Sequence, residues 1–358
     1  MTHEIFVGTG PEAPLTMRIG LQDISLGIRA VQPPEFDPVS FRHRNHVLLR
    51  VRAISANFRD KALIVDAAYR ATQSSGPPWA HFGSEFAAEV MAVGRDVDSL
   101  AVGVLVMPDA AFPSASEEWL SPGIVTNGAS AGWLVLPAGK LMPVPTWMSD
   151  VDAAGYSLSA QTATAMVRQG RVTADSRVLV LSGRSSTSLG ILCALQDSGA
   201  EVYVASSRPW TAEEIHSLGP SGRESVYLDV DELPTFTRHF DVVFDPFIDM
   251  HVTRAIATIR PWGRYVTCGF IEQHPLFQEG TVHAPNFHEV ISQVITGNVS
   301  IVGNCIGTTE DLREAIAVGP GSLVPVDSVF TPDRVVDFLE RTFNERSKLG
   351  KVILRFSS

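Results

Sequence analysis

A turn of small polar residues between two apolar runs is the stretch best suited to bind a ligand. Residues 182–188 form this turn, residues 178–181 before it are apolar and partly β-branched, and residues 189–196 after it are apolar at helical spacing. Residues 201–205 again have the pattern of a buried strand, so the segment predicts a βαβ unit. A turn in this position presents backbone N–H groups at a helix N-terminus, where nucleotide phosphates bind.

The dinucleotide fingerprint G-x-G-x-x-G is only partly present in this turn. Laid over it, the pattern falls on Gly183, Ser185 and Ser188, so only the first glycine remains. Serine is small, and its hydroxyl can donate to a phosphate oxygen. The residues predicted to bind a pyrophosphate are Gly183, Ser185, Ser186 and Thr187. The alternative interpretation is a buried βαβ unit with a serine-rich turn and no nucleotide.

The end of the second predicted strand indicates which nicotinamide cofactor fits. An NAD site usually has Asp or Glu roughly 20 residues after the glycines, bound to the ribose 2′-hydroxyl. Here the chain reads Ser206-Ser207-Arg208, with no carboxylate before Glu213. Two hydroxyls and a guanidinium suit a 2′-phosphate, so we expect NADPH. The alternative for Arg208 is a solvated surface arginine.

Composition limits the class of protein. The 358 residues are 45% hydrophobic and 19% charged, which favours two domains with a sizeable core. A net charge of −11 without a basic run argues against nucleic acid or an anionic membrane as a partner. No apolar run reaches about 18 residues and no signal peptide is evident, so neither membrane insertion nor secretion is expected. Cys193, Cys268 and Cys305 are far apart in apolar segments, which is typical of thiols in a reducing compartment, so a cytoplasmic location is expected.

The remaining chain divides into a β-rich part and a part in which predicted strands and helices alternate. Residues 1 to about 150 predict a β-rich unit, with residues 47–54 as a half-buried strand. A helix is expected over residues 150–169. Beyond the βαβ unit we expect further strands at 225–228, 240–245, 264–268 and 299–303, and helices at 211–218, 252–259 and 287–296. This pattern predicts an open, mostly parallel sheet with helices on both faces. The tail, residues 326–356, is predicted to return to the first unit.

The order and spacing of several strings resemble the medium-chain dehydrogenase/reductase superfamily over nearly the whole chain. The similarity is greatest to its zinc-independent branch of quinone oxidoreductases and enoyl reductases. The strings are VLLRVRAISANFRD, FGSEFAAEVMAVGRDVDSL, DAAGYSLSAQTATAMV, FDVVFDPF, IRPWGRYVTCGF, IVGNCIG and LGKVIL. The resemblance implies an α/β fold with a GroES-like domain (residues 1–154 and 322–358) and a doubly wound Rossmann domain (residues 155–321). It also implies a homodimer, for which residues 299–303 are the candidate edge strand.

The same resemblance shows where a catalytic zinc would be held. Alcohol dehydrogenases of the superfamily use a Cys, the His of a G-H-E string and a second Cys, and these positions fall at or near Asn57, Ser84 and Ser159-Ala160. Because zinc needs three or four N, S or O ligands at one point, no metal is expected here. Without zinc, hydride can still reach the β-carbon of a conjugated C=C, because the negative charge spreads onto oxygen as an enolate.

The resemblance also implies roles for individual side chains. The catalytic candidates are Tyr69, whose phenol can donate to an enolate, Asn57, which can donate to the ribose or the substrate, and Asp60. Alternatives are a packing role for Tyr69 and a helix-capping or ion-pairing role for Asp60. Its neighbours Arg59 and Lys61 are expected to be solvated. Further cofactor-binding candidates are Thr162, Gly269, Phe270, Asn304 and Lys351, and Thr162 can instead bond back to its own helix.

The sequence therefore predicts a zinc-independent, NADPH-dependent reductase of an activated C=C or a quinone, acting on a small molecule. One alternative is a metal-free carbonyl or alcohol oxidoreductase with the same cofactor. The other is a family member that has lost the cofactor and acts as a binding protein or a redox-neutral catalyst.

Overall fold

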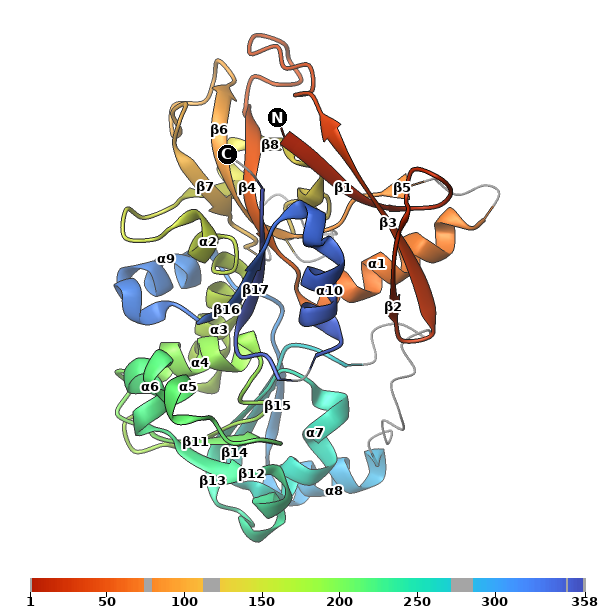
Figure 1. Ribbon diagram of the computed structural model, residues 1–358. Helices are drawn as coiled ribbons and strands as arrows, with labels where there is room; N and C mark the ends of the chain where they lie inside the picture. Colours follow the sequence, from red (N-terminus) through yellow and green to blue (C-terminus); the bar gives the residue numbers. More distant parts are fainter. Residues whose placement is uncertain (1, 74–78, 112–122, 272–285, 346, 357–358) are drawn as a thin grey trace.

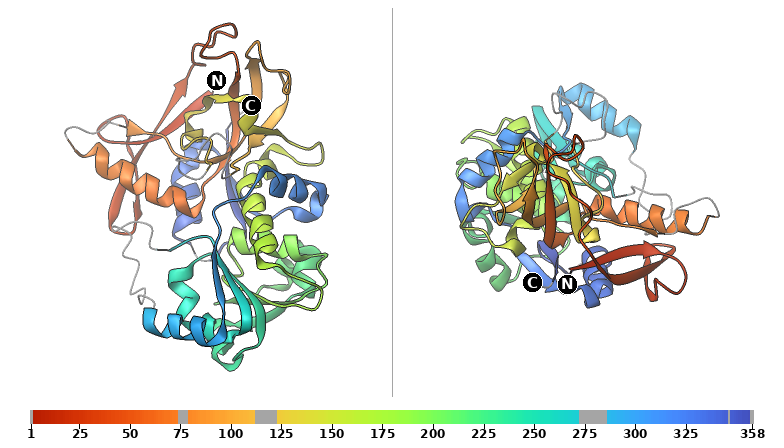
Figure 2. Two further views of the ribbon diagram at one scale, coloured as in Figure 1. Left: turned by 180° about the vertical axis from the view of Figure 1, so that it is seen from behind. Right: turned by 90° about the horizontal axis from the view of Figure 1, so that it is seen from above.

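The computed structural model describes residues 2–73, 79–111, 123–271, 286–345 and 347–356 (Figure 1). Within these ranges the strands form sheets of four, six and seven strands. The six-stranded sheet lies in the lower half of Figure 1, and the other two lie above it together with both chain ends. The views in Figure 2 show the same division into two halves, with the chain crossing between them more than once.

The six-stranded sheet is parallel throughout and is ordered β12-β11-β10-β13-β14-β15. Its strands are β10 (Arg177–Val180), β11 (Glu201–Ser206), β12 (Val226–Asp229), β13 (Phe240–Asp245), β14 (Ile259–Thr267) and β15 (Ser300–Gly303). The β10 core residues Val178, Leu179 and Val180 are fully buried, because the sheet is covered on both faces. This arrangement confirms the predicted doubly wound α/β fold.

Helices pack on both faces of the parallel sheet. One apolar cluster joins α3 and α4 to the sheet, and a second joins α7 and α8 to its other face. The helices of this half are α3 (Ser157–Gly170), α4 (Ser186–Leu195), α5 (Ala212–Ser217), α6 (Gly219–Glu224), α7 (Ile248–Ala255), α8 (Phe287–Gly297) and α9 (Thr309–Ala317). None of the described helices has the length and apolar character needed to cross a bilayer.

The seven-stranded sheet combines both ends of the chain. Its order is β16-β17-β4-β6-β7-β9, and β8 pairs with β4. The strands are β4 (His46–Ser55), β6 (Glu85–Val93), β7 (Leu105–Pro108), β8 (Trp133–Pro137), β9 (Leu141–Pro143), β16 (Val326–Phe330) and β17 (Lys351–Arg355). Because β17 pairs antiparallel with β4, with Ile353 opposite Ser55, the C-terminal tail brings Lys351 next to the N-terminal half.

The four-stranded sheet, ordered β2-β3-β1-β5, completes the upper half. Its strands are β1 (Thr2–Gly8), β2 (Leu15–Ile19), β3 (Gln22–Val31) and β5 (Trp79–Ala80), and the helices of this half are α1 (Phe58–Ala71), α2 (Asp150–Ala153) and α10 (Val335–Phe343). One large apolar cluster spans these elements and the adjoining seven-stranded sheet.

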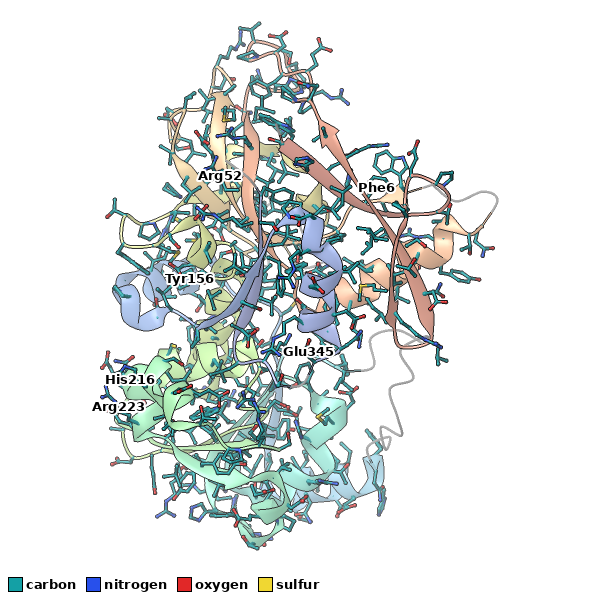
Figure 3. The ribbon with its side chains drawn as sticks, viewed as in Figure 1. Phe6, Arg52, Tyr156, His216, Arg223 and Glu345 are labelled. Carbon is teal, nitrogen blue, oxygen red and sulfur yellow. The ribbon has the colours of Figure 1, made fainter. Side chains whose placement is uncertain are left out.

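The helix expected over residues 150–169 is in fact two helices, α2 and α3. A buried carboxylate explains the second start, because Glu85 Oε1 accepts the N–H groups of Leu158 at 2.8 Å and Ser159 at 3.4 Å. Tyr156 lies at the break (Figure 3), and its hydroxyl is 2.7 Å from the Ser322 hydroxyl. A carboxylate from another strand thus begins a helix that periodicity alone could not separate.

The helix expected over residues 252–259 begins and ends earlier, at Ile248 and Ala255. Its predicted last residue, Ile259, instead begins β14, which includes the stretch that was expected to close the helix. Pairing with β13 explains the difference, because Phe240 lies opposite Ile259 before the register shifts at Val242. A tertiary pairing therefore overrides the local turn signal of Pro261 and Gly263.

Candidate active site

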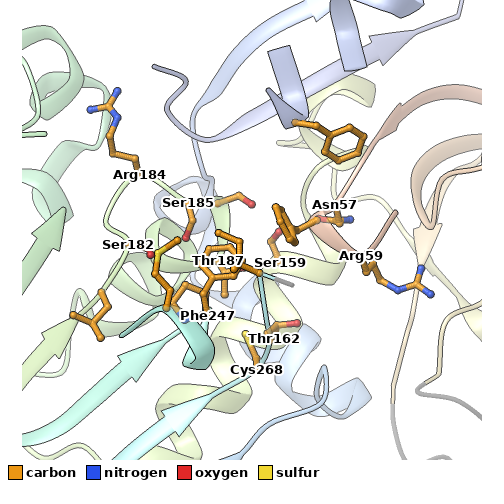
Figure 4. A pocket seen from close by; sticks show the side chains of 18 of the residues that line it. Asn57, Arg59, Ser159, Thr162, Ser182, Arg184, Ser185, Thr187, Phe247 and Cys268 are labelled. Atoms are coloured by element: carbon orange, nitrogen blue, oxygen red, sulfur yellow. The ribbon is translucent and has the colours of Figure 1, made fainter. Parts of the chain in front are cut away.

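A cavity of 1510 Å³ lies at the carboxyl edge of the parallel sheet, facing the seven-stranded sheet. This edge is where ligands bind in open α/β sheets. Figure 4 shows Ser182, Ser185 and Thr187 on one side of the cavity and Asn57 and Arg59 on the other. Among the described residues, its lining includes the cationic side chains of Arg59, Arg184, Arg254, Lys348 and Lys351. In a chain with a net charge of −11, this local excess of cations favours an anionic ligand.

The serine-rich turn keeps the N-terminus of α4 accessible from the cavity. Ser185 caps the helix, accepting the Ser188 N–H at 3.2 Å, and the buried Ser188 hydroxyl donates to the Leu181 carbonyl at 2.6 Å. The two serines that replace glycines are thus bonded within the turn. Ser186 and Thr187, in the first helical turn, line the cavity. Their N–H groups have no partner within the helix and suit a phosphate.

Packing explains why Gly183 is the glycine that remains. A Cβ at this position would stand 2.3 Å from Val204 Cγ1 on β11, closer than any side chain tolerates. The glycine therefore lets the turn pack against the neighbouring strand.

Of the three residues at the end of β11 that were predicted to bind a 2′-phosphate, Arg208 differs from the prediction. Ser206 and Ser207 line the cavity, whereas Arg208 is not among its described lining residues. The Arg208 guanidinium donates to the Ser347 carbonyl at 3.0 Å and lies 3.7 Å from Glu214 Oε1. The expectation of no nearby carboxylate is therefore wrong, because the first turn of α5 brings Glu214 to this place.

Arg184, which the sequence analysis did not single out, is a basic residue that lines the cavity beside the serine-rich turn. Its guanidinium donates to both Glu214 oxygens and to the Ser347 carbonyl, 3.0 Å away. These hydrogen bonds lower the pKa of Glu214. Arg184 Nε is buried without a partner among the described residues. A basic residue directly after the first fingerprint glycine was the available sequence signal.

A buried charged triangle forms the opposite wall. Lys351 Nζ donates to Glu85 Oε2 at 2.7 Å and to Asn57 Oδ1 at 2.7 Å, and Asn57 Nδ2 donates to Glu85 at 3.0 Å. Ser55 Oγ donates to the same Glu85 oxygen at 2.8 Å. Burial raises the pKa of Glu85, but the Lys351 ammonium and the surrounding donors outweigh it and hold that pKa below its usual range. Glu85 was missed from the sequence because its partners lie far along the chain.

Asp60 and Ser84 lie beside this triangle and bond to each other. The Ser84 hydroxyl is 3.1 Å from both Asp60 oxygens, and Asp60 Oδ2 accepts the Asn57 N–H at 2.7 Å. Asp60 thereby caps α1, as the structural alternative predicted. Burial raises the pKa of this fully buried carboxyl, against the lowering effect of Arg59.

The three positions implied as zinc ligands do meet in space, but their chemistry is not that of a zinc site. Asn57 bonds to Glu85, the Ser159 N–H faces the same carboxylate, and Ser84 bonds to Asp60. No group of three or more His, Cys, Asp or Glu side chains in the described ranges is placed to hold a metal ion. An amide, two hydroxyls and an ammonium form a donor set that zinc does not favour.

The other predicted residues divide into two groups. Thr162 and Gly269 line the cavity, and Thr162 Oγ1 also donates to the Leu158 carbonyl at 2.7 Å. Phe270, which is 57% exposed, and Asn304 are not among the described lining residues. The Asn304 side chain is bonded to Gln169 and to the Ile306 carbonyl, at 2.5 and 2.8 Å.

Tyr69 is also not brought to the cavity. It lies near the C-terminal end of α1 and is 49% exposed. It is eleven positions after Phe58 in the helix, roughly 16 Å along the axis. Lys61 differs from expectation too: it is 1% exposed, because it lies on the buried face of α1 with its ammonium 5.3 Å from the Phe58 ring centroid. Arg59 lines the cavity and donates to Asn127 at 2.9 Å.

A serine–histidine contact lies under the turn and was not predicted. Ser182, with a φ of 53°, and His251 both line the cavity, and Ser182 Oγ lies 2.8 Å from His251 Nε2. Burial, with help from Arg254, lowers the pKa of His251 to about 4, so the ring is neutral at pH 7. The pair holds α7 against the carboxyl end of β10.

Comparison with known proteins agrees with this geometry. Residues 43–146 match the family model described as "Alcohol dehydrogenase GroES-like domain". A highly reducing polyketide synthase, ACRTS2 of Alternaria alternata, is 29% identical over 262 residues, which cover 69% of this chain and 9% of that protein. A zinc-type alcohol dehydrogenase-like protein of Schizosaccharomyces pombe is 24% identical, covering 95% of this chain and 99% of that protein. The chain thus spans about a tenth of one relative and nearly all of the other.

Solved structures share the whole fold. A crotonyl-CoA carboxylase/reductase in complex with NADP superposes with a TM-score of 0.74 at 15% identity, covering 99% of this chain and 94% of that one. An alcohol dehydrogenase and a quinone oxidoreductase have the same architecture. The chain thus shares the fold of these dehydrogenases and reductases, and residues 43–146 match their GroES-like domain, which confirms the resemblance.

Proposed function

We propose that the chain is a zinc-independent, NADPH-dependent reductase that transfers hydride to an activated C=C, in an enone or enoyl compound, or to a quinone. The observation that carries this proposal is the charged triangle of Asn57, Glu85 and Lys351. It lies where the resemblance implies a zinc site, on the wall of a cavity that also contains the N-terminus of α4. Conjugated acceptors need hydrogen-bond donors at their oxygen rather than a metal.

The residues of the cavity fit a dinucleotide. The Ser186 and Thr187 amides suit the pyrophosphate, the Ser206 and Ser207 hydroxyls suit the adenosine ribose and its 2′-phosphate, and Thr162 lines the same cavity. When bound, the reduced nicotinamide would supply the hydride. The protein's part is to hold the cofactor and to present donors to the substrate oxygen.

The names of the relatives favour an enoyl substrate over a quinone. One is a highly reducing polyketide synthase, and one structural neighbour is a crotonyl-CoA carboxylase/reductase. One name refers to a polyketide and the other to crotonyl-CoA, and the cationic lining of this cavity suits an acyl group joined to a phosphate-bearing carrier. Free and carrier-bound substrates therefore belong in the same assay.

The proposal is tested by titrating purified protein with NADPH and NADH, followed by fluorescence, and by measuring turnover with an enone, a quinone and a simple ketone. We expect tighter binding of NADPH, turnover of the enone or quinone, and no loss of activity with EDTA. Elemental analysis should find no stoichiometric zinc. Turnover of the ketone alone would favour the carbonyl oxidoreductase. Failure to bind either cofactor would refute the proposal and favour a binding protein.

We also propose a homodimer and a cytoplasmic location. In the described sheet, β15 is an edge strand, and its Ile301 is 39% exposed, so a second copy is a suitable cover. The three cysteines are free thiols, which suits a reducing compartment.

A further inference from the structure

Among the described residues, the Lys351 ammonium has acceptors for two of its three N–H groups. An ammonium carries three N–H groups, and here one is directed to Glu85 and one to Asn57, each at 2.7 Å. The side chain is otherwise buried, with 4% exposed, yet it lines the cavity. Where a ligand enters, the third N–H is therefore available to an acceptor on that ligand.

The ammonium is also held in place. Glu85 accepts from Lys351, Ser55 and Asn57 through one oxygen, and its other oxygen accepts the first N–H groups of α3. The carboxylate is thus fixed by two strands and a helix and keeps the cation in one position. Gly155 maintains this packing, because a Cβ there would stand 2.9 Å from Lys351 Cγ. A charge fixed before the reaction costs no reorganisation during it.

The Asn57 contact places this cation beside the position that the resemblance gives to the first zinc ligand. Within the described ranges, the acceptors of this cation are Glu85 and Asn57, and the other nearby carboxylate, Asp60, is bonded to Ser84 and to the Asn57 amide. A cation with a free donor thus stands where relatives would place a Lewis acid.

We propose that Lys351 is a catalytic residue that donates its third N–H to the carbonyl oxygen of the substrate, in place of a metal. This inference rests on the proposed function. With the reduced nicotinamide bound, hydride would add to the β-carbon and the C=C electron pair would form the enolate, and the Lys351 N–H would bind the resulting oxyanion. The α-carbon then takes a proton from water, the carbonyl re-forms, and Lys351 keeps its own protons.

The test removes the pair as a whole, because Lys351→Met alone would leave Glu85 buried and unpaired. We expect Lys351→Met/Glu85→Gln to lower kcat for the enone by about 100- to 1000-fold, the usual loss for one oxyanion donor. The NADPH Kd is expected to stay within about threefold. The matched control is Arg341→Met/Asp327→Asn, which removes the ion pair between helix α10 and strand β16. That pair is not among the described lining residues, so kcat should be retained.

A second readout needs no turnover. 4-Nitrophenol presents an enolate-like oxyanion, and its ionisation can be followed by absorbance in the cofactor-free protein. The wild type and the control variant are expected to lower the pKa of the bound phenol by about one unit or more, and Lys351→Met/Glu85→Gln is expected to abolish this shift. Thermal unfolding confirms that each variant is folded.

Three results would overturn the inference. The folded variant Lys351→Met/Glu85→Gln could keep the wild-type kcat, or it could bind 4-nitrophenol with the same pKa as the wild type does. The third result is a Kd for NADPH raised more than about tenfold in this variant with kcat retained. The last result would make Lys351 a cofactor ligand. Absence of NADPH binding or turnover in the wild-type protein refutes the proposed function itself, so the two failures are distinguishable.

Discussion

Arg208 provides the sharpest test of the cofactor preference. It is not among the described lining residues, but it shares Glu214 and the Ser347 carbonyl with Arg184, which lines the cavity. The Arg208 guanidinium is near Glu214, at 3.7 Å, and its side chain is 48% exposed. A charge-assisted hydrogen bond to a 2′-phosphate contributes about 1.5–3 kcal/mol, and solvent exposure and the competing carboxylate favour the lower end. Arg208→Ala is therefore expected to weaken NADPH binding by about tenfold. NADH has no 2′-phosphate, so its Kd should be unchanged.

The assay is a fluorescence titration of both cofactors at constant ionic strength. Arg177→Ala is the matched control, because Arg177 is 49% exposed and pairs with Glu201 at 3.2 Å, away from the described cavity lining. We expect this control to bind both cofactors as the wild type does. An equal loss for NADH and NADPH, or no loss at all, would refute the assignment of Arg208 and turn attention to Arg184.

Three further predictions concern Tyr69, Asp245 and the edge strand. Tyr69→Phe is expected to leave kcat within about twofold, because the phenol lies outside the described cavity lining, and a tenfold fall would restore its catalytic role. Burial raises the pKa of Asp245 to about 7 from 3.8, so the folded state keeps a proton that the unfolded chain loses, and stability falls as pH rises through this range. Between pH 4 and 7, the free energy of unfolding of Asp245→Asn in urea should therefore rise by on the order of 1–4 kcal/mol relative to that of the wild type. A difference between the two proteins that does not change with pH would contradict this. Light scattering should give a dimer mass, and Ile301→Lys on β15 should give a monomer; a monomeric wild type would end the dimer proposal.

Local signals were enough to predict the half of the molecule that contains the parallel sheet. The run at residues 178–181 formed β10, the serine turn stayed a turn, and residues 186–195 formed α4. These elements are coded by neighbouring residues, because burial on both faces demands a continuous apolar strand and a helix demands apolar residues at its own period. The order of the family strings likewise anticipated the overall architecture.

Local patterns failed where a distant group decided an element. The break between α2 and α3 depends on Glu85, which is 73 residues before Leu158. The early start of β14 depends on its pairing with β13. The sequences of the two affected segments contain no local signal of these contacts with Glu85 and β13.

The candidate site also has features that local sequence predicts and features that depend on distant residues. The sequence by itself determined which side chains occupy the positions that the resemblance gives to zinc ligands, and which small residues form the turn before α4. Only the tertiary structure decided that Glu214 meets Arg208 and that Lys351 meets Glu85 and Asn57, which are 266 and 294 residues away. Tyr69 is the opposite case: the resemblance gave it a catalytic role, but the structure places it exposed near the C-terminal end of α1. The physical reason is that a charge is buried only with its partner, and that partner is chosen by chain topology rather than by spacing along the chain.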